Sequence, residues 1–109
     1  MSVSVKVDLS RAIKKLSQNN INRGRYTMSN QMLADMNQFV PAKDYHLRGS
    51  GHVSFDGSQL IWNTPYAAKM FYVQFSKYTA SGTGPRWDLK GKSLFMNDWI
   101  RAFKKGASL

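Results

Sequence analysis

One short stretch, residues 49–63 with the sequence GSGHVSFDGSQLIWN, constrains the fold more than any other part of the chain. It contains the pair Asp56-Gly57, and apolar residues alternate with polar ones on both sides of it, at Val53, Phe55, Leu60 and Trp62. An Asp-Gly pair between two alternating arms is a strong hairpin signal, because both turn positions tolerate a positive φ angle. We therefore predict a β-hairpin that turns at Asp56 and Gly57, within a small, mostly antiparallel sheet.

The N-terminus shows the same period of two, at Val3, Val5 and Val7. Alternation over so few residues predicts either a short strand or an extended arm. Residues 1–8 are therefore either a strand of this chain or a flexible arm. Such an arm could be exchanged with a neighbouring copy and add a strand to its sheet.

Two stretches between the N-terminus and residue 40 have helical spacing. The first follows Asp8 or Ser10 as its cap and carries Leu9, Ile13 and Leu16. The second lies between residues 25 and 40 and carries Met28, Met32, Leu33, Met36 and Phe39. Asn19, Asn20 and Gly24 disfavour a helix between them, and Pro41 ends the second. We predict two helices, or one helix bent near Gly24, and we interpret the methionines as core residues rather than as an adaptable binding groove.

The second half of the chain predicts a final helix that follows a loop. Residues 66–78 fit a helix through Tyr66, Met70 and Val73, or a strand through Phe71, Val73 and Phe75, and the periodicity leaves this open. Residues 76–86 contain closely spaced Gly and Pro and predict a loop. A helix from Asp88 or Ser93 to Gly106 has a wide apolar stripe, at Phe95, Met96, Trp99, Ile100 and Phe103. The predicted fold class is α+β, in a single domain over residues 1–109.

The chain is strongly basic, with a formal net charge of +10, and it contains no cysteine. Its net charge is +5 over residues 1–25, −1 over residues 26–68 and +6 over residues 69–109. A basic chain can meet nucleic acid, an anionic membrane surface or an acidic protein face. No apolar run approaches the roughly 20 residues that cross a bilayer, and the start lacks the pattern of a secretory signal. We therefore expect no membrane partner, and the missing cysteine fits a reducing cytoplasm.

Catalytic patterns are weak in this sequence. A metal site would need His46 and His52 together with Asp44 or Asp56, and exposed imidazoles are the simpler interpretation. The glycine pairs 49/51 and 82/84 are too short for a phosphate-binding loop. We therefore predict a protein that is not an enzyme and needs no cofactor. Two binding roles remain: a nucleic-acid module with contacts at Lys77, Tyr78 and Arg86, or an assembly protein whose basic ends dock on other subunits.

Three separated elements occur in order, namely WNTPYA at residues 62–67, GTGPRW at 82–87 and an aromatic, basic helix at 99–105. In this order they resemble a family of minor capsid proteins encoded in the head-to-tail gene block of siphophages. The resemblance covers about residues 40–106. It extends to Pro41 and the pair Leu47-Arg48, although His46 stands where the broader head–tail joining pattern has glycine.

The resemblance implies a structural role in the phage neck. It implies an α+β fold with an N-terminal helical part, a small antiparallel sheet and a C-terminal helix. Members of this kind form a homo-oligomeric ring between the portal or stopper side of the head and the tail tube. They complete the tail, and DNA passes through the ring without sequence-specific binding. The implied location is the head–tail junction of a virion assembled in the bacterial cytoplasm, and a tail terminator is the close alternative.

Residue roles follow from this expectation. Contacts with neighbouring subunits or the tail are expected at Arg86, Trp87, Lys90, Lys92, Arg101, Lys104, Lys105, Val3 and Val5. The joint between the sheet and the following segment is expected at Asp56, Gly57, Trp62, Pro65 and Tyr66. Trp and Arg dominate interface energetics, which favours Arg86 and Trp87, but core packing is an equal alternative for Trp87.

Overall fold

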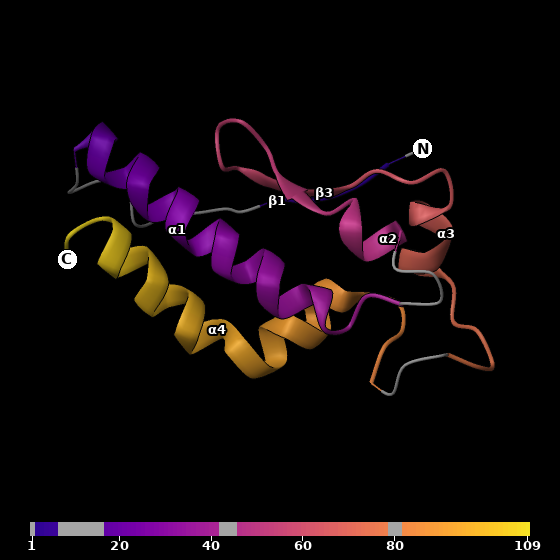
Figure 1. Cartoon of the computed structure of the whole chain (residues 1–109). Helices are drawn as coiled ribbons and strands as arrows, with labels where there is room; N and C mark the ends of the chain where they lie inside the picture. The colour runs from indigo at the N-terminus through magenta and orange to yellow at the C-terminus, as the bar shows by residue number, and fades with distance from the viewer. Residues whose placement is uncertain (1, 7–16, 42–45, 79–81) are drawn as a thin grey trace.

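The computed structural model describes residues 2–6, 17–41, 46–78 and 82–109. In chain order its elements are β1 Val3–Lys6, α1 Gln18–Asn37, α2 His46–Gly49, β2 His52–Val53, β3 Gln59–Trp62, α3 Ala67–Tyr72 and α4 Trp87–Gly106. The two long helices, α1 and α4, lie side by side, and the sheet lies next to α1 (Figure 1). The α+β class predicted from the sequence is confirmed.

The sheet is antiparallel, with strand order β1-β3-β2. Val53 pairs with Leu60 across the hairpin, and Val3 pairs with Trp62 on the other side of β3. Residues 3–6 are therefore a strand that pairs within its own chain. The predicted hairpin and its antiparallel sheet are confirmed.

The hairpin turn differs in one respect from the prediction. The Gly57 amide donates to the Ser54 carbonyl oxygen at 2.9 Å, which places Phe55 and Asp56 at the centre of the turn. Gly57 follows with a φ angle of 74°, and it alone in the turn has a positive φ. This is the pattern of a type I turn followed by a left-handed glycine. Phe55, predicted to lie on a strand, is therefore at the tip of the hairpin.

Helix α1 begins inside the polar stretch that we expected to interrupt a helix. Ser17 caps it, and the Ser17 hydroxyl accepts a hydrogen bond from the Asn20 amide at 3.2 Å. The helix continues without a break through Gly24, so the predicted interruption there is wrong. The first predicted helix, near residues 9–16, lies outside the described residues.

Gly24 stays in the helix because a second helix comes unusually close at that position. A Cβ atom at Gly24 would lie 2.8 Å from Cε2 of Phe103 and 2.9 Å from the Phe103 carbonyl oxygen. A Cβ at Gly106 would likewise meet the Arg23 carbonyl oxygen at 2.7 Å. These glycines thus let the backbones of α1 and α4 approach, which offsets the poor helix propensity of glycine.

A buried polar contact also joins α1 to α4. The Trp99 indole Nε1 donates to Oδ2 of Asp35 at 2.8 Å, and Gln31 donates to the same carboxylate at 3.1 and 3.2 Å. Asp35 is only 9% exposed. A buried carboxylate is costly unless it is hydrogen-bonded, so this contact favours one register of the two helices.

The ambiguous segment 66–78 is helical in its first part. Ala67–Tyr72 form α3, and the Met70 amide donates to the Tyr66 carbonyl oxygen at 3.1 Å. Val73 then adopts an extended conformation that ends the helix, and no strand follows in the described residues up to 78. The strand alternative is therefore wrong. The final helix starts at Trp87, one residue before the predicted Asp88, so the alternative start at Ser93 is wrong, and it ends at Gly106 as predicted.

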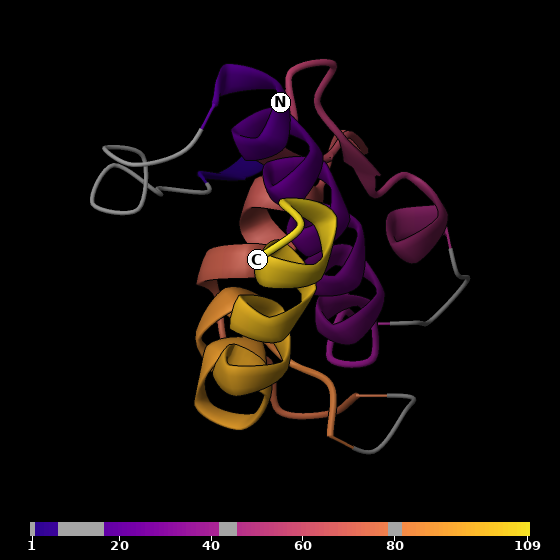
Figure 2. The ribbon, with the colours of Figure 1, turned by 90° about the vertical axis from the view of Figure 1, so that its left-hand side faces the viewer.

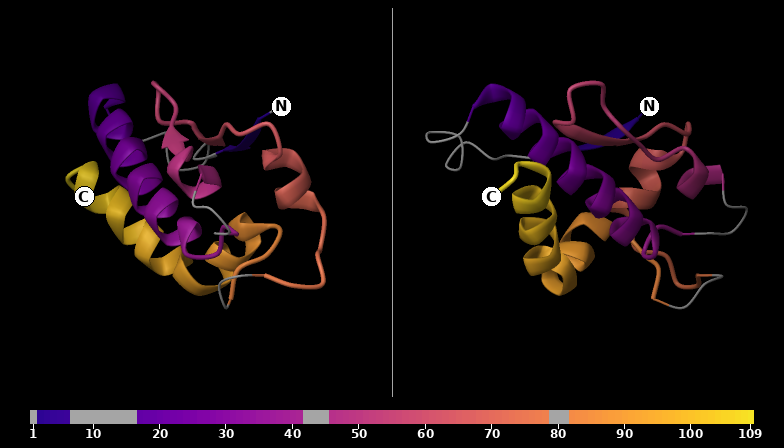
Figure 3. Two further views of the ribbon diagram at one scale, coloured as in Figure 1. Left: turned by 45° about the vertical axis from the view of Figure 1, so that its right-hand side comes forward. Right: turned by 60° about the vertical axis from the view of Figure 1, so that its left-hand side comes forward.

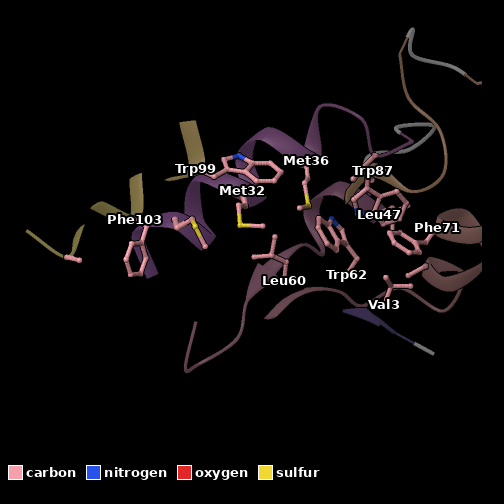
Figure 4. Close-up of a cluster of buried hydrophobic side chains, with 14 residues drawn as sticks. Val3, Met32, Met36, Leu47, Leu60, Trp62, Phe71, Trp87, Trp99 and Phe103 are labelled. Atoms are coloured by element: carbon pink, nitrogen blue, oxygen red, sulfur yellow. The ribbon is translucent and has the colours of Figure 1, made fainter. Parts of the chain in front are cut away.

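The core is formed by the inner faces of α1 and α4, the sheet and α3. Met28, Met32 and Met36 are 6%, 8% and 1% exposed, which confirms that they are core residues. Figure 4 shows the aromatic end of the core, where Trp62, Trp87 and Phe71 lie together with Leu47 of α2. No helix in the described part of the chain has both the length and the apolar character that a bilayer span requires.

Candidate interaction surfaces

The joint between the sheet and the last helix is a buried aromatic cluster. The Trp87 ring centroid lies 5.3 Å from that of Trp62 and 4.8 Å from that of Phe71, both in edge-to-face contact (Figure 4). The Trp62 indole Nε1 donates to Asn37 Oδ1 at 2.9 Å, while the Trp87 indole Nε1 is buried and has no hydrogen-bond partner among the described residues. Trp62 and Trp87 are both 0% exposed. Trp87 therefore packs in the core here, and it presents no surface to a neighbouring subunit.

Arg86 holds the aromatic cluster from outside. It caps α4 in the left-handed region, with φ 47° and ψ 54°, a conformation that non-glycine residues rarely adopt. Its amide donates to the Phe71 carbonyl oxygen at 2.8 Å, and its guanidinium lies 4.9 Å from the centre of the Phe71 ring. The guanidinium also donates twice to Asp88, at 2.9 and 2.7 Å, and these bonds raise the pKa of Arg86. Arg86 is therefore engaged within the chain.

The remaining predicted contact residues take up three kinds of position. The exposed cations on α4 are Lys92, Arg101, Lys104 and Lys105, with Arg101 paired to Asp98. Lys90 is half-buried, and its side chain crosses Gly84. Val3 is 5% exposed and belongs to the core, whereas Val5 is half-buried. The structure thus leaves the cations of α4 available to a partner but not Val3.

The residues of the nucleic-acid alternative are only partly available. Lys77 is exposed. The Tyr78 hydroxyl accepts a hydrogen bond from the Phe75 amide at 3.0 Å, and the Tyr78 ring lies edge-to-face against the Phe75 ring. The third residue, Arg86, is bound to Asp88 and Phe71. No stacking platform of adjacent exposed aromatics with free cations arises among these three residues.

An apolar groove lies between β1, α1 and α4. It has a cavity volume of about 460 Å³, and we call it the methionine groove. Its floor is buried and consists of Met28, Met32, Met36 and Trp99. Its rim carries the exposed residues Lys6, Leu89, Lys92 and Ile100, and the half-buried Val5, Asp88 and Met96 complete its lining. Leu89 and Ile100 are 53% and 43% exposed, so apolar side chains at this rim face solvent.

The hairpin tip, residues 54–58, is fixed to α1 by side-chain hydrogen bonds. The Tyr26 hydroxyl donates to the Phe55 carbonyl oxygen at 2.6 Å, and the Ser29 hydroxyl donates to the Gly57 carbonyl oxygen at 2.7 Å. Phe55 itself is 97% exposed, the most exposed large apolar residue in the described part of the chain. The turn that carries it is therefore anchored, while its ring contacts almost nothing.

The family model described as "Minor capsid protein" matches residues 3–107. The chain belongs to this family of phage minor capsid proteins. No curated protein and no solved structure matches it. It is accordingly a structural component of the phage virion and makes contacts with other virion proteins.

The phage minor capsid protein contains no evident metal centre in its described residues. His52 Nδ1 lies 2.9 Å from the Ser50 carbonyl oxygen. The Asp56 carboxylate accepts hydrogen bonds from Ser54 and Ser58 within the hairpin turn. Among the residues that the structure describes, no group of three His or Asp side chains is placed to hold a metal ion. Asp44, the other acid considered from sequence, lies outside those residues.

Asp56 gives the minor capsid protein a pH-sensitive turn. Its Oδ1 accepts from the Ser58 hydroxyl at 2.6 Å, from the Ser58 amide at 3.0 Å and from the Ser54 hydroxyl at 2.8 Å. These bonds lower the pKa of Asp56 from 3.8 to about 2, with the Ser58 hydroxyl as the largest cause. A lowered folded-state pKa stabilises the fold above the unfolded-state value and loses that contribution as the pH falls through the folded-state value.

We expect Asp56→Asn to destabilise the protein near neutral pH but not at pH 2. The charged carboxylate stabilises the turn fully above about pH 4, and this contribution disappears between pH 3.8 and about 2. Urea unfolding of both proteins from pH 6 to pH 2 measures the difference, which should shrink towards zero at the acid end. A difference that is the same at pH 6 and pH 2 would show that the charge of Asp56 does not stabilise the turn.

The spacing of the methionines left a binding groove as the less favoured alternative to core packing, and the structure shows both, because the buried methionines also form the floor of the groove. The exposure of Phe55 was not predicted from the sequence. The groove combines residues from β1, α1 and α4, whose proximity depends on tertiary packing. Phe55 was assigned to a strand because it continues the alternation of Val53. In the structure the Ser54 amide donates to the Gln59 carbonyl oxygen at 2.8 Å, so residues 55–58 form the loop and Phe55 is its first residue.

Proposed function

We propose that this protein forms a homo-oligomeric ring in the phage neck, joining the portal or stopper side of the DNA-filled head to the tail tube. The observation that carries the proposal is the solvent face of α4. There, exposed cations (Lys92, Arg101, Lys104 and Lys105) adjoin uncovered apolar residues at the rim of the methionine groove. On such a face the cations can speed and orient the approach of an acidic neighbour, and the apolar residues can be buried in the contact.

Charge distribution supports a contact role in which the chain meets acidic surfaces. Half of the net charge of +6 over residues 69–109 is carried by α4, whose five cations outnumber its two acids, and the central part of the sequence is nearly neutral. Basic patches speed association with acidic partners and fix their orientation more than they add affinity. In this role DNA passes along the ring axis, and its phosphates are neutralised without reading of the bases.

A ring built from one kind of subunit needs two different surfaces on each copy. A head-to-tail contact between such surfaces closes into a ring when the rotation between copies closes, and cyclic symmetry leaves a central channel for DNA. The sheet side and the α4 side of this chain present different chemistry, which meets that requirement. Figure 3 shows both sides, with the hairpin and α4 on separate parts of the molecule.

Virions produced without this protein test the proposal. We expect full heads that separate from finished tails of normal length, because the joint is lost while both parts still assemble. Electron micrographs of the particles measure this, with complementation by the wild-type chain as the control. Overlong tails would instead identify a tail terminator, because tube growth would lack its stop. Normal virions with attached tails would contradict a neck role altogether.

A further inference from the structure

The hairpin tip presents an aromatic side chain on a pre-organised support. Phe55 is 97% exposed, yet its carbonyl oxygen is held by Tyr26 and the turn is braced by the three hydrogen bonds to Asp56. The backbone of the turn is thus ordered, whereas the Phe55 ring gains no packing in the isolated chain. A contact through this ring would cost the rotamer freedom of one side chain with two χ angles, because the backbone beneath it is already ordered.

The methionine groove offers a site of matching chemistry on another face of the same chain. Its floor is formed by flexible, polarizable thioethers, which adapt to an aromatic ring and make favourable sulfur–ring contacts. Leu89 and Ile100 mark its rim and lie eleven residues apart on α4, about 16 Å along the helix axis. The groove is therefore long enough to take a ring together with backbone on either side of it.

The hairpin tip and the methionine groove do not meet within one chain. The Phe55 ring is 97% exposed and is not among the residues that line the groove. Figure 2 shows the same arrangement, with the hairpin loop and β1 on opposite sides of α1. The two surfaces are thus suited to a contact between copies.

Charge complementarity supports a second copy as the occupant. Asp56 is exposed on the tip beside Phe55, and it is ionised at neutral pH. The rim of the groove carries the exposed cations Lys6 and Lys92, and its one acid, Asp88, is already paired with Arg86. The acid next to the aromatic ring is thus complementary to cations at the groove that have no ion pair within the described part of the chain. Such a pairing opposes the repulsion between two chains of net charge +10.

We propose that Phe55 of one copy inserts into the methionine groove of the next copy, with Asp56 beside Lys6 or Lys92. The contact is head-to-tail, because it uses two different surfaces, and repetition of it generates a ring. This inference rests on the proposed ring and names its subunit contact. One aromatic side chain buries about 150–250 Å², whereas a stable interface buries about 800 Å² per partner. Phe55 is thus the anchor of a larger contact area.

Paired single-cysteine variants test the contact directly, because the natural chain contains no cysteine. Full-length Ser58→Cys and Leu89→Cys proteins, which both keep Phe55 and Asp56, are mixed and treated with a short bifunctional thiol cross-linker; Ser58 lies at the same hairpin tip. We expect a covalent dimer in this mixture and much less in either protein alone, as a head-to-tail contact requires. The matched control replaces Leu89→Cys by Leu94→Cys, which is 66% exposed on the same helix and does not line the groove.

Surface variants give a second readout that does not depend on thiols. Phe55→Ser and Ile100→Lys should each weaken self-association by at least about 30-fold, as loss of a hot-spot residue does. Their melting temperatures should stay unchanged, since both side chains are exposed. The controls are Tyr72→Ser and Leu94→Lys, which remove exposed apolar groups away from the tip and the groove. Analytical ultracentrifugation over a concentration series measures the association.

Each remaining outcome decides against the contact. Equal cross-linking with Leu94→Cys, or a chain that stays monomeric at every concentration, overturns it. Cross-linking of Leu89→Cys to Ile13→Cys within one chain also overturns it, because the chain's own residues then occupy the groove. The proposed neck role is read separately, from the position of the protein in virions. If the protein is found in the neck and Phe55→Ser still assembles normally, only the proposed contact is contradicted. If the protein is found elsewhere in the virion, the neck role is contradicted.

Discussion

Trp87→Ala should lower the free energy of unfolding by about 3–5 kcal/mol, the range for deleting a large buried aromatic side chain. Trp87 is 0% exposed and lies in edge-to-face contact with Trp62 and Phe71, so truncation leaves a cavity where the sheet meets α3 and α4. Domains of this size are stable by only about 5–15 kcal/mol, so the loss is a large share of the total. Urea unfolding followed by circular dichroism measures it.

The matched control for this variant is Leu94→Ala on the same helix. Leu94 is 66% exposed and lies outside the buried cluster, so its truncation should change stability by about 0.5 kcal/mol or less. If Trp87→Ala were as stable as the control and it alone lost self-association, Trp87 would be an interface residue and not a core residue. That result would contradict the packing of the aromatic joint described above.

Gly24→Ala should destabilise the protein by about 1–3 kcal/mol, although alanine is the better helix former. The added methyl group would lie 2.8 and 2.9 Å from the Phe103 ring and 2.9 Å from the Phe103 carbonyl oxygen. The ring can rotate, but a backbone oxygen can yield only if α4 moves away from α1. Thermal and urea unfolding measure the change, and we expect a lower midpoint.

Gly49→Ala is the control for the glycine substitution. A Cβ at Gly49 meets nothing within 4 Å, and this residue ends the short helix α2. The same chemical change should therefore be neutral or slightly stabilising there, because alanine restricts the unfolded chain more than glycine does. If Gly24→Ala were as stable as Gly49→Ala, the two long helices would not approach as closely as described.

Local sequence signals predicted those elements whose structure is decided locally. The Asp56-Gly57 turn and the alternating arms were sufficient to place the hairpin, and its register depends on short-range pairing of Val53 with Leu60. The last helix combines an apolar stripe with Gly106 at its end, so its end was predicted, and of its two predicted starts Asp88 lies within one residue of the observed one. Such features agree with the fold at every level of description.

Tertiary contacts decided the features that the sequence did not predict. Gly24 is a helix breaker in isolation, but the close packing of Phe103 makes it a contact point inside α1. Arg86 adopts a left-handed conformation that its residue type disfavours, and contacts with Phe71 and Asp88 accompany it. The methionine groove depends on three elements that are distant in the sequence. No local pattern carries information of this kind.

The position of the protein in the virion tests the central claim most directly. A cryo-electron microscopy reconstruction of the neck of intact virions, computed without imposed icosahedral symmetry, measures that position. The proposal predicts a ring of copies of this chain between the head and the tail tube, with α4 and the hairpin of adjacent copies in contact. Density for the chain on the faces of the capsid shell, with none at the head–tail junction, would contradict it.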